Sequence, residues 1–139
     1  MGICGFITIG TEPGEQGALK DLAEKFEDVW FTVGIHPHEA KLYNQAAEDE
    51  MTGLISHPKC VAVGEIGLDY WYGHSTPEEQ KNSLKAQLAL ALKYNKPIVV
   101  HARNAKDSSS IKDVAKPSAE EEMIPLFADY ASKCKEKSR

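Results

Sequence analysis

The chain has 139 residues, 42% of them hydrophobic, and a formal net charge of −5 at pH 7. This length and composition suit one globular domain that can bury a single core. The acidic balance excludes a broadly basic surface that would hold nucleic acid through many phosphate contacts. A phosphate-bearing substrate would therefore need a local cationic site.

Cysteine usage and hydropathy bear on the compartment. Cys4, Cys60 and Cys134 form no CxxC pair, and an odd number of widely spaced thiols is typical of reduced cysteines in a cytoplasmic protein. No apolar run approaches the roughly 20 residues that a membrane span needs. We expect a cytoplasmic protein with no membrane partner.

Four short runs of β-branched and apolar side chains predict strands at residues 3–9, 29–33, 61–63 and 98–100. Stretches with helical character separate these runs. Connections of about 25 to 35 residues give room for crossover helices between parallel strands. The sequence therefore predicts the α/β class, with parallel (β/α) units.

The helix with the strongest sequence signal is predicted at residues 76–94. Thr76 and Glu79 have the spacing of a capping box, with a proline between them in the first turn. Gln80 and Gln87 fall on the apolar stripe of this helix, so both amides need hydrogen-bond partners inside the fold.

Weaker patterns predict two earlier helices at residues 17–26 and 44–56. Residues 104–117 are polar and rich in serine and lysine, which favours a loop or a weak helix. A last helix should begin at Ser118, bend at Pro125 and end near residue 135.

The segment of residues 61–70 combines a buried strand, a carboxylate and a glycine-punctuated loop. Strict strand alternation places Glu65 on the same face as Val61 and Val63. A carboxylate that points into an apolar set needs a cation or a strong donor, because an unpaired buried charge is costly. Glu65 is therefore either a metal ligand or a salt-bridged structural residue.

A second strand repeats this arrangement one unit later. His101 shares a face with Val99 and lies at the carboxyl end of its strand, where the active sites of parallel barrels gather. Alone, His101 could be a core histidine with satisfied hydrogen bonds. Together with Glu65 it becomes a candidate metal ligand, since imidazole and carboxylate both bind divalent ions.

Two further histidines follow the strand at residues 29–33. His36 and His38 could bind a phosphate or orient a ligand, and His38 could instead cap the next helix. Arg103 is a natural phosphate clamp, because its planar guanidinium matches two oxygens. His57 and His74 look like surface loop residues.

Four segments together resemble the TatD family of metal-dependent deoxyribonucleases: GIHPH at 34–38, GEIGLDY at 64–70, the helix carrying Gln80 and Gln87, and PIVVHAR at 97–103. The resemblance implies a TIM barrel of eight (β/α) units, a divalent metal site, often with two ions, and hydrolysis of DNA, typically from the 3′ end. It also implies that Glu65 is a metal-bridging carboxylate and His101 a metal ligand.

From the resemblance we expect Glu65, His101 and Asp69 to form the catalytic group, with magnesium, manganese or zinc as cofactor and DNA as substrate. Asp69 and Tyr70 are expected in the loop above the site, where Asp69 would orient a ligand or a water molecule rather than bind the metal directly. His36, His38 and Arg103 are expected to hold the substrate.

The sequence departs from the family pattern because some of the family's metal ligands and barrel strands have no counterpart in it. Family members begin with a strand that carries an HxH metal-binding pair and later supply another histidine and an aspartate, none of which has a counterpart here. Residues 1–105 correspond to about strands two to five, half a barrel, and residues 106–139 form a divergent polar loop and C-terminal helix.

Half a barrel leaves strand edges open. We therefore expect self-association, or a partner chain that completes the barrel, through flanks near residues 5–9 and 98–100. We also expect incomplete catalysis by this chain alone. Two alternatives stay open: a non-catalytic binding or assembly module, and an amidohydrolase-type hydrolase of small molecules.

Overall fold

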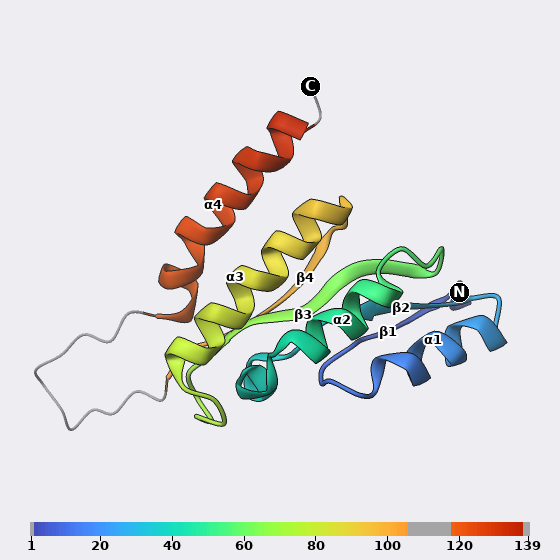
Figure 1. The fold of residues 1–139 in the computed structure, drawn as a ribbon, viewed down its shortest axis with the longest axis horizontal. Coiled ribbons are helices and arrows are strands. Elements are labelled where there is room, and N and C mark those ends of the chain that lie inside the picture. The colour runs from blue at the N-terminus through green and yellow to red at the C-terminus, as the bar shows by residue number, and fades with distance from the viewer. Residues whose placement is uncertain (1, 106–117, 138–139) are drawn as a thin grey trace, which may run out of the picture.

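The structure is a computed structural model that describes residues 2–105 and 118–137, in which strands and helices alternate along the chain (Figure 1). The elements are β1 (Phe6–Thr8), α1 (Gln16–Lys25), β2 (Val29–Val33), the 3₁₀ helix η1 (Pro37–Leu42), α2 (Gln45–Leu54), β3 (Cys60–Asp69), α3 (Pro77–Tyr94), β4 (Ile98–Arg103) and α4 (Ala119–Lys137).

The four strands form one parallel sheet in the order β1-β2-β3-β4. Each strand lies beside the next one in sequence, and the intervening chain crosses over through a helix. This arrangement confirms the predicted α/β class. It also gathers the carboxyl ends of all four strands at one edge of the sheet, where the loops that carry polar residues begin.

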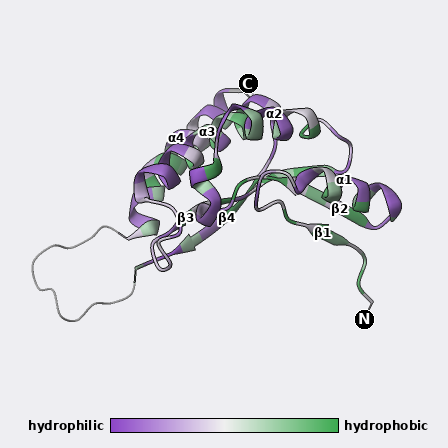
Figure 2. Cartoon of the chain, turned by 60° about the horizontal axis from the view of Figure 1, so that its bottom comes forward, coloured by the Kyte–Doolittle hydropathy of each residue, from purple (hydrophilic) through white to green (hydrophobic). Residues whose placement is uncertain are grey.

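The helices cover one face of the sheet, as Figures 1 and 2 show. The core between the two layers consists of buried apolar side chains from both; the largest of them are Phe31, Ile35, Met51, Ile55, Ile66, Leu68 and Leu84. α4 packs against α3, β3 and β4, and contributes Ala119 and Met123 to this core. Among the described helices, none is long and apolar enough to cross a membrane.

Local sequence signals explain the helix ends. The capping box of α3 is present, with the Thr76 hydroxyl accepting from the Glu79 amide and the Glu79 carboxylate accepting from the Thr76 amide. Asn44 caps α2 by accepting from the backbone amide of Ala47. α3 ends at Tyr94, and the residue that follows, Asn95, has the left-handed conformation typical of the end of a helix.

The two inward-facing glutamines of α3 find the partners that their burial requires. The Gln80 side-chain oxygen accepts from the Asp69 amide at 2.7 Å, and its nitrogen donates to the carbonyls of Asp69 and Ser75, both at 2.9 Å. Gln87 pairs in the same way with the backbone of Ile35. These bonds fix the carboxyl ends of β3 and β2 against the helix layer.

β3 differs most from its predicted form, because the strand runs on to Asp69. Asp69 is therefore the fully buried last residue of a strand, and not a loop residue as predicted. The pairing with β4 shifts by one residue between Val63 and Ile66. This extra residue breaks strict alternation, so Glu65 does not share the core-facing side with Val63 as predicted.

Other boundaries differ less. β1 is shorter than predicted, and β4 continues through His101 to Arg103. α4 is one continuous helix that contains Pro125, and Ser118 and Glu121 bond to each other reciprocally at its start. Most of the predicted loop at residues 104–117 lies outside the described residues.

Candidate metal centre

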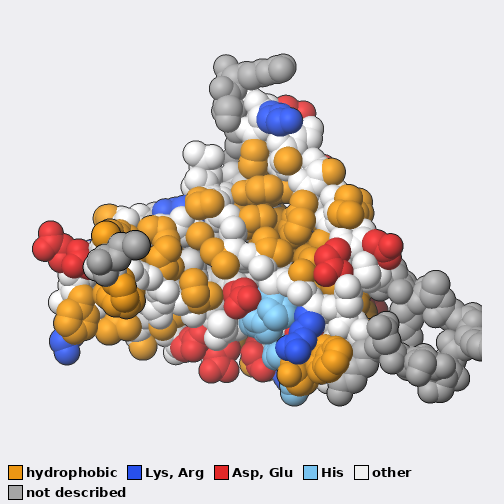
Figure 3. Space-filling model, turned by 180° about the vertical axis from the view of Figure 1, so that it is seen from behind, with side chains coloured by type: hydrophobic (Ala, Val, Ile, Leu, Met, Phe, Trp, Pro, Cys, Tyr) orange, Lys and Arg blue, Asp and Glu red, His pale blue; other side chains and the backbone are white. Residues whose placement is uncertain are grey.

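Polar side chains converge where β2, β3 and β4 end. On the face drawn in Figure 3, histidine side chains gather beside acidic side chains and a Lys or Arg side chain. A hollow of about 350 Å³ opens here, lined by Thr11, Glu12, His36, His38, Glu39 and Glu65. The hollow is therefore walled by imidazoles and carboxylates, which are the ligand types of divalent metals.

The loop after β1 holds Glu65 in place. The Glu65 amide donates to the carbonyl of Gly10 at 2.8 Å. The Gly10 amide in turn donates to the buried Thr32 hydroxyl at 3.0 Å, and that hydroxyl donates to the carbonyl of Gly64. These bonds thus tie the loop after β1 to β2 and β3 around the backbone of Glu65, which fixes where its side chain begins.

Close contact between β3 and β4 brings His101 next to this carboxylate. Gly67 pairs with His101, and a Cβ atom at Gly67 would lie 1.9 Å from the His101 carbonyl oxygen. The φ of Gly67 is +148°, which also disfavours any other residue. The glycine of the GEIGLDY segment therefore lets the two site-bearing strands approach each other.

His101 lies between two carboxylates. Its Nε2 is 2.9 Å from an Asp69 oxygen and its Nδ1 is 3.2 Å from a Glu65 oxygen. A neutral imidazole has one N–H and one lone pair. Once Nε2–H donates to Asp69, the Nδ1 lone pair faces the Glu65 oxygen, and both of these atoms are acceptors. Either a second proton on the ring or a metal cation between the two atoms would make the contact favourable. The pair is thus a donor set that fits a divalent metal.

Asp69 acts as an acceptor for four donors. One oxygen contacts Nε2 of both His38 and His101 at 2.9 Å, and the other accepts from the amides of Trp71 at 2.9 Å and Tyr72 at 3.2 Å. Burial alone would raise the pKa of Asp69, but the bonds from the two imidazoles and the two amides outweigh it and lower the pKa to about 2. Asp69 is therefore ionised near pH 7, with its carboxylate oxygens in contact with donors of the protein itself.

His36 joins Glu65 and His101 as a third possible ligand, with one potential ligand atom from each of the three lying within 4.8 Å of the others. Burial and the neighbouring imidazoles of His101 and His38 lower the pKa of His36 to about 4, so its ring is neutral near pH 7. The His36 Nδ1 accepts from the His38 amide at 3.2 Å. This bond favours a proton on Nε2, which suits a donor to a phosphate or water oxygen.

His38 and Arg103 border the cluster. His38 is held by Asp69, and its ring contacts those of His36 and Tyr72 at centroid distances of 4.4 Å and 5.3 Å. The predicted helix-capping role of His38 falls instead to His36, the N-cap of η1. The Arg103 guanidinium lies over neighbouring aromatic rings rather than over the carboxylates.

All six residues predicted for the site thus lie at one edge of the sheet, and Glu65, His101 and Asp69 are in direct contact. Their chemical roles stay predictions. Sequence reasoning did not foresee that His36 lies close enough to share an ion with Glu65 and His101. It also passed over Trp71 and Tyr72, for which the run of aromatic letters after GEIGLDY was an available signal.

The chain is similar in sequence to a known protein family. A family model described as TatD related DNase matches residues 1–129. The "3'-5' ssDNA/RNA exonuclease TatD" of Escherichia coli strain K12 is 37% identical over 106 residues, which are 76% of this chain and 41% of that protein. A protein of the same description from Edwardsiella piscicida is 40% identical over 105 residues, 75% of this chain and 40% of that protein. The chain spans about 40% of the length of these curated relatives.

Solved structures agree on the fold. A TatD homologue from Escherichia coli K12 matches with a TM-score of 0.67 at 30% identity, over 73% of this chain and 40% of its own. A TatD family hydrolase from Entamoeba histolytica, 23% identical, matches with a TM-score of 0.71 over 94% of this chain and 42% of its own. The four parallel strands and their helices are about half of a TIM-barrel-like fold. From its sequence and its fold alike, the chain belongs to the TatD related DNase family.

Proposed function

We propose that this chain supplies part of the active site of a metal-dependent hydrolase that cleaves phosphodiester bonds of DNA. The observation that carries the proposal is the position of His101 between the carboxylates of Asp69 and Glu65, which matches a metal ligand backed by an orienting carboxylate. The curated relatives described as single-strand DNA and RNA exonucleases support the choice of a nucleic-acid substrate.

In this proposal Glu65 and Nδ1 of His101 hold a divalent ion, either magnesium, manganese or zinc. When bound, such an ion lowers the pKa of a water molecule and polarises a phosphate oxygen. Asp69 keeps the proton of His101 on Nε2 and directs Nδ1 toward Glu65. An imidazole held in one tautomer and one orientation binds an ion with less reorganisation.

The remaining polar groups hold the phosphate. The ring of His36 is neutral near pH 7. Its Nε2–H would therefore donate to a phosphate oxygen without adding a positive charge that repels the metal ion. His38 contributes a second imidazole, and Arg103 supplies the local cation that an acidic chain needs in order to bind nucleic acid. His36 serves as a third metal ligand only if its bond to the His38 amide is given up.

The number of metal ligands that this chain supplies bears on whether it can be catalytic by itself. Among the described residues the site offers Glu65, His101 and at most His36, whereas a two-metal site needs more ligands than these. We therefore propose that the complete assembly is active and that this chain alone has little or no activity. The missing ligands would come from another segment or a partner chain.

Where such a partner would bind follows from exposure at the sheet edges. Phe6 and Ile7 on β1 are 58% and 55% exposed, and Val100 on β4 is 39% exposed. We propose self-association or partner binding through these flanks. We also propose that the chain divides at residue 105. The odd number of cysteines, which form no CxxC pair, favours a cytoplasmic location.

The experiment is a degradation assay with end-labelled DNA. It compares this chain with a version that carries the missing barrel strands, each with magnesium, manganese or zinc and each with EDTA. We expect chelator-sensitive degradation only by the completed version, abolished by Glu65→Ala. Strong degradation by the short chain would refute incompleteness, and no degradation by the completed version with any metal would refute the nuclease activity.

A further inference from the structure

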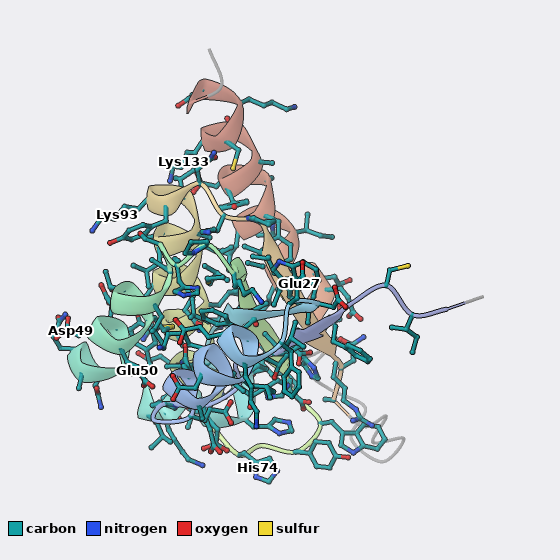
Figure 4. All side chains as sticks on the ribbon, turned by 90° about the vertical axis from the view of Figure 1, so that its right-hand side faces the viewer. Glu27, Asp49, Glu50, His74, Lys93 and Lys133 are labelled. Atoms are coloured by element: carbon teal, nitrogen blue, oxygen red, sulfur yellow. The ribbon has the colours of Figure 1, made fainter. Side chains whose placement is uncertain are left out.

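The loop after β3 carries exposed aromatic rings next to the candidate metal centre. Trp71 is 38% exposed and Tyr72 is 52% exposed. The Arg103 guanidinium lies over both rings, 5.0 Å from each centroid. The ring of His74 stacks on Tyr72 at 5.6 Å with an interplanar angle of 18°, and Figure 4 labels His74 on this loop. These four flat groups thus lie against one another, and we call the cluster the aromatic platform.

The platform is fastened to the site by the carboxylate that also holds His101. One Asp69 oxygen accepts from the amides of Trp71 and Tyr72, while the other contacts the His101 and His38 rings. Arg103 pairs with Asp69 across the sheet and stands two residues beyond His101 on β4. The position of the platform relative to the candidate ligands is therefore fixed by short bonds rather than by a free loop.

Exposed aromatic side chains at such a place need an explanation beyond core packing. These rings lie outside the buried core of the chain, in the loop that follows the carboxyl end of β3. An unpaired base presents a flat π-face, and such faces stack on Trp, Tyr and guanidinium groups whatever the base identity. Arg103 adds the positive charge that a neighbouring phosphate requires.

We propose that Trp71, Tyr72 and Arg103 form a stacking subsite for an unpaired base of single-stranded nucleic acid, next to the phosphate at the metal centre. The proposal rests on the nuclease function proposed above and deepens it, because it names residues that select an unpaired strand. A base within a duplex is stacked on its neighbours and hydrogen-bonded to its partner, so it cannot occupy the platform without being flipped out.

The two tryptophans of the chain make a direct test of stacking possible. Trp30 on β2 and Trp71 are the only tryptophans in the sequence, so Trp30→Phe leaves Trp71 as the sole indole reporter. The ligand is pentathymidylate with phosphorothioate linkages, which resist hydrolysis. Its binding is followed by Trp71 fluorescence in magnesium and, separately, in EDTA.

Two control ligands and two variants identify the contact. The first ligand control is an abasic phosphorothioate oligomer of equal length, and the second is a blunt duplex. Tyr72→Leu in the Trp30→Phe background should weaken binding of pentathymidylate roughly five- to 150-fold, the range expected for one base–aromatic stack. Phe26→Leu is the matched control, because Phe26 is another exposed ring, 48% accessible, placed before β2 at the opposite end of the sheet.

We expect pentathymidylate to quench Trp71, and the abasic oligomer and the duplex to leave its emission unchanged. No quenching, equal quenching by the abasic oligomer, or an unchanged dissociation constant in Tyr72→Leu would each overturn the platform. DNA degradation by the barrel-completed version reports separately on the proposed function. Quenching without degradation would refute the proposed hydrolase function and support the stacking subsite. Degradation without quenching would refute the stacking subsite alone.

Discussion

Gln80 is the side chain whose replacement tests most directly how α3 supports the site. It is 1% exposed and makes three hydrogen bonds to backbone groups, two of them to Asp69. Gln80→Met keeps a similar volume but removes every bond. The amide and carbonyl of Asp69 then lie buried without these partners, and each such group costs about 1–3 kcal/mol. We expect a loss of roughly 2–6 kcal/mol in the free energy of unfolding.

The assay is urea unfolding of the full chain followed by far-ultraviolet circular dichroism. The matched control is Gln45→Met on α2, an exposed glutamine whose side-chain nitrogen donates to Asp49 within the same helix. For this variant we expect a change within about 0.5 kcal/mol. If Gln80→Met unfolds at the same urea concentration as the parent chain, the bonds of Gln80 do not hold the end of β3.

Two further predictions concern other parts of the fold. Gly67→Ala should destabilise the chain by roughly 3 kcal/mol or more, because its Cβ would meet the His101 carbonyl; Gly53→Ala, on open space in α2, should stabilise it by about 0.5–1 kcal/mol. Equal melting temperatures for these variants would contradict the close strand approach. Burial raises the pKa of the Cys60 thiol, which lowers its thiolate fraction, so Ellman's reagent should modify exposed Cys4 first and Cys60 only on unfolding. Rapid native modification of Cys60 would contradict its burial.

Sequence reasoning located the elements that have strong local signals. The capping box at Thr76 is a contact within one turn, so its letters predict its geometry. The glutamine stripe of α3 predicted buried partners without identifying them, because the backbone groups of Asp69 and Ile35 are brought there only by the tertiary fold.

At the site, the sequence predicted which residues meet but not the strand register that positions them. Glu65 and His101 were paired from their positions on parallel strands, and they do meet. The face assigned to Glu65 was wrong because a one-residue register shift in β3 has no clear signature in the letters. Asp69 was placed in a loop because glycines usually end strands, whereas here Gly67 permits close strand pairing.

The most direct test of the central claim is a calorimetric titration of the purified chain with manganese or zinc at pH 7. We expect specific binding that Glu65→Ala or His101→Ala abolishes and Asp69→Ala weakens about 10- to 100-fold. The control Asp49→Ala, on the exposed side of α2 away from the site (Figure 4), should leave the affinity unchanged. Absence of binding with either metal, or binding that survives Glu65→Ala and is lost in Asp69→Ala, would contradict the account.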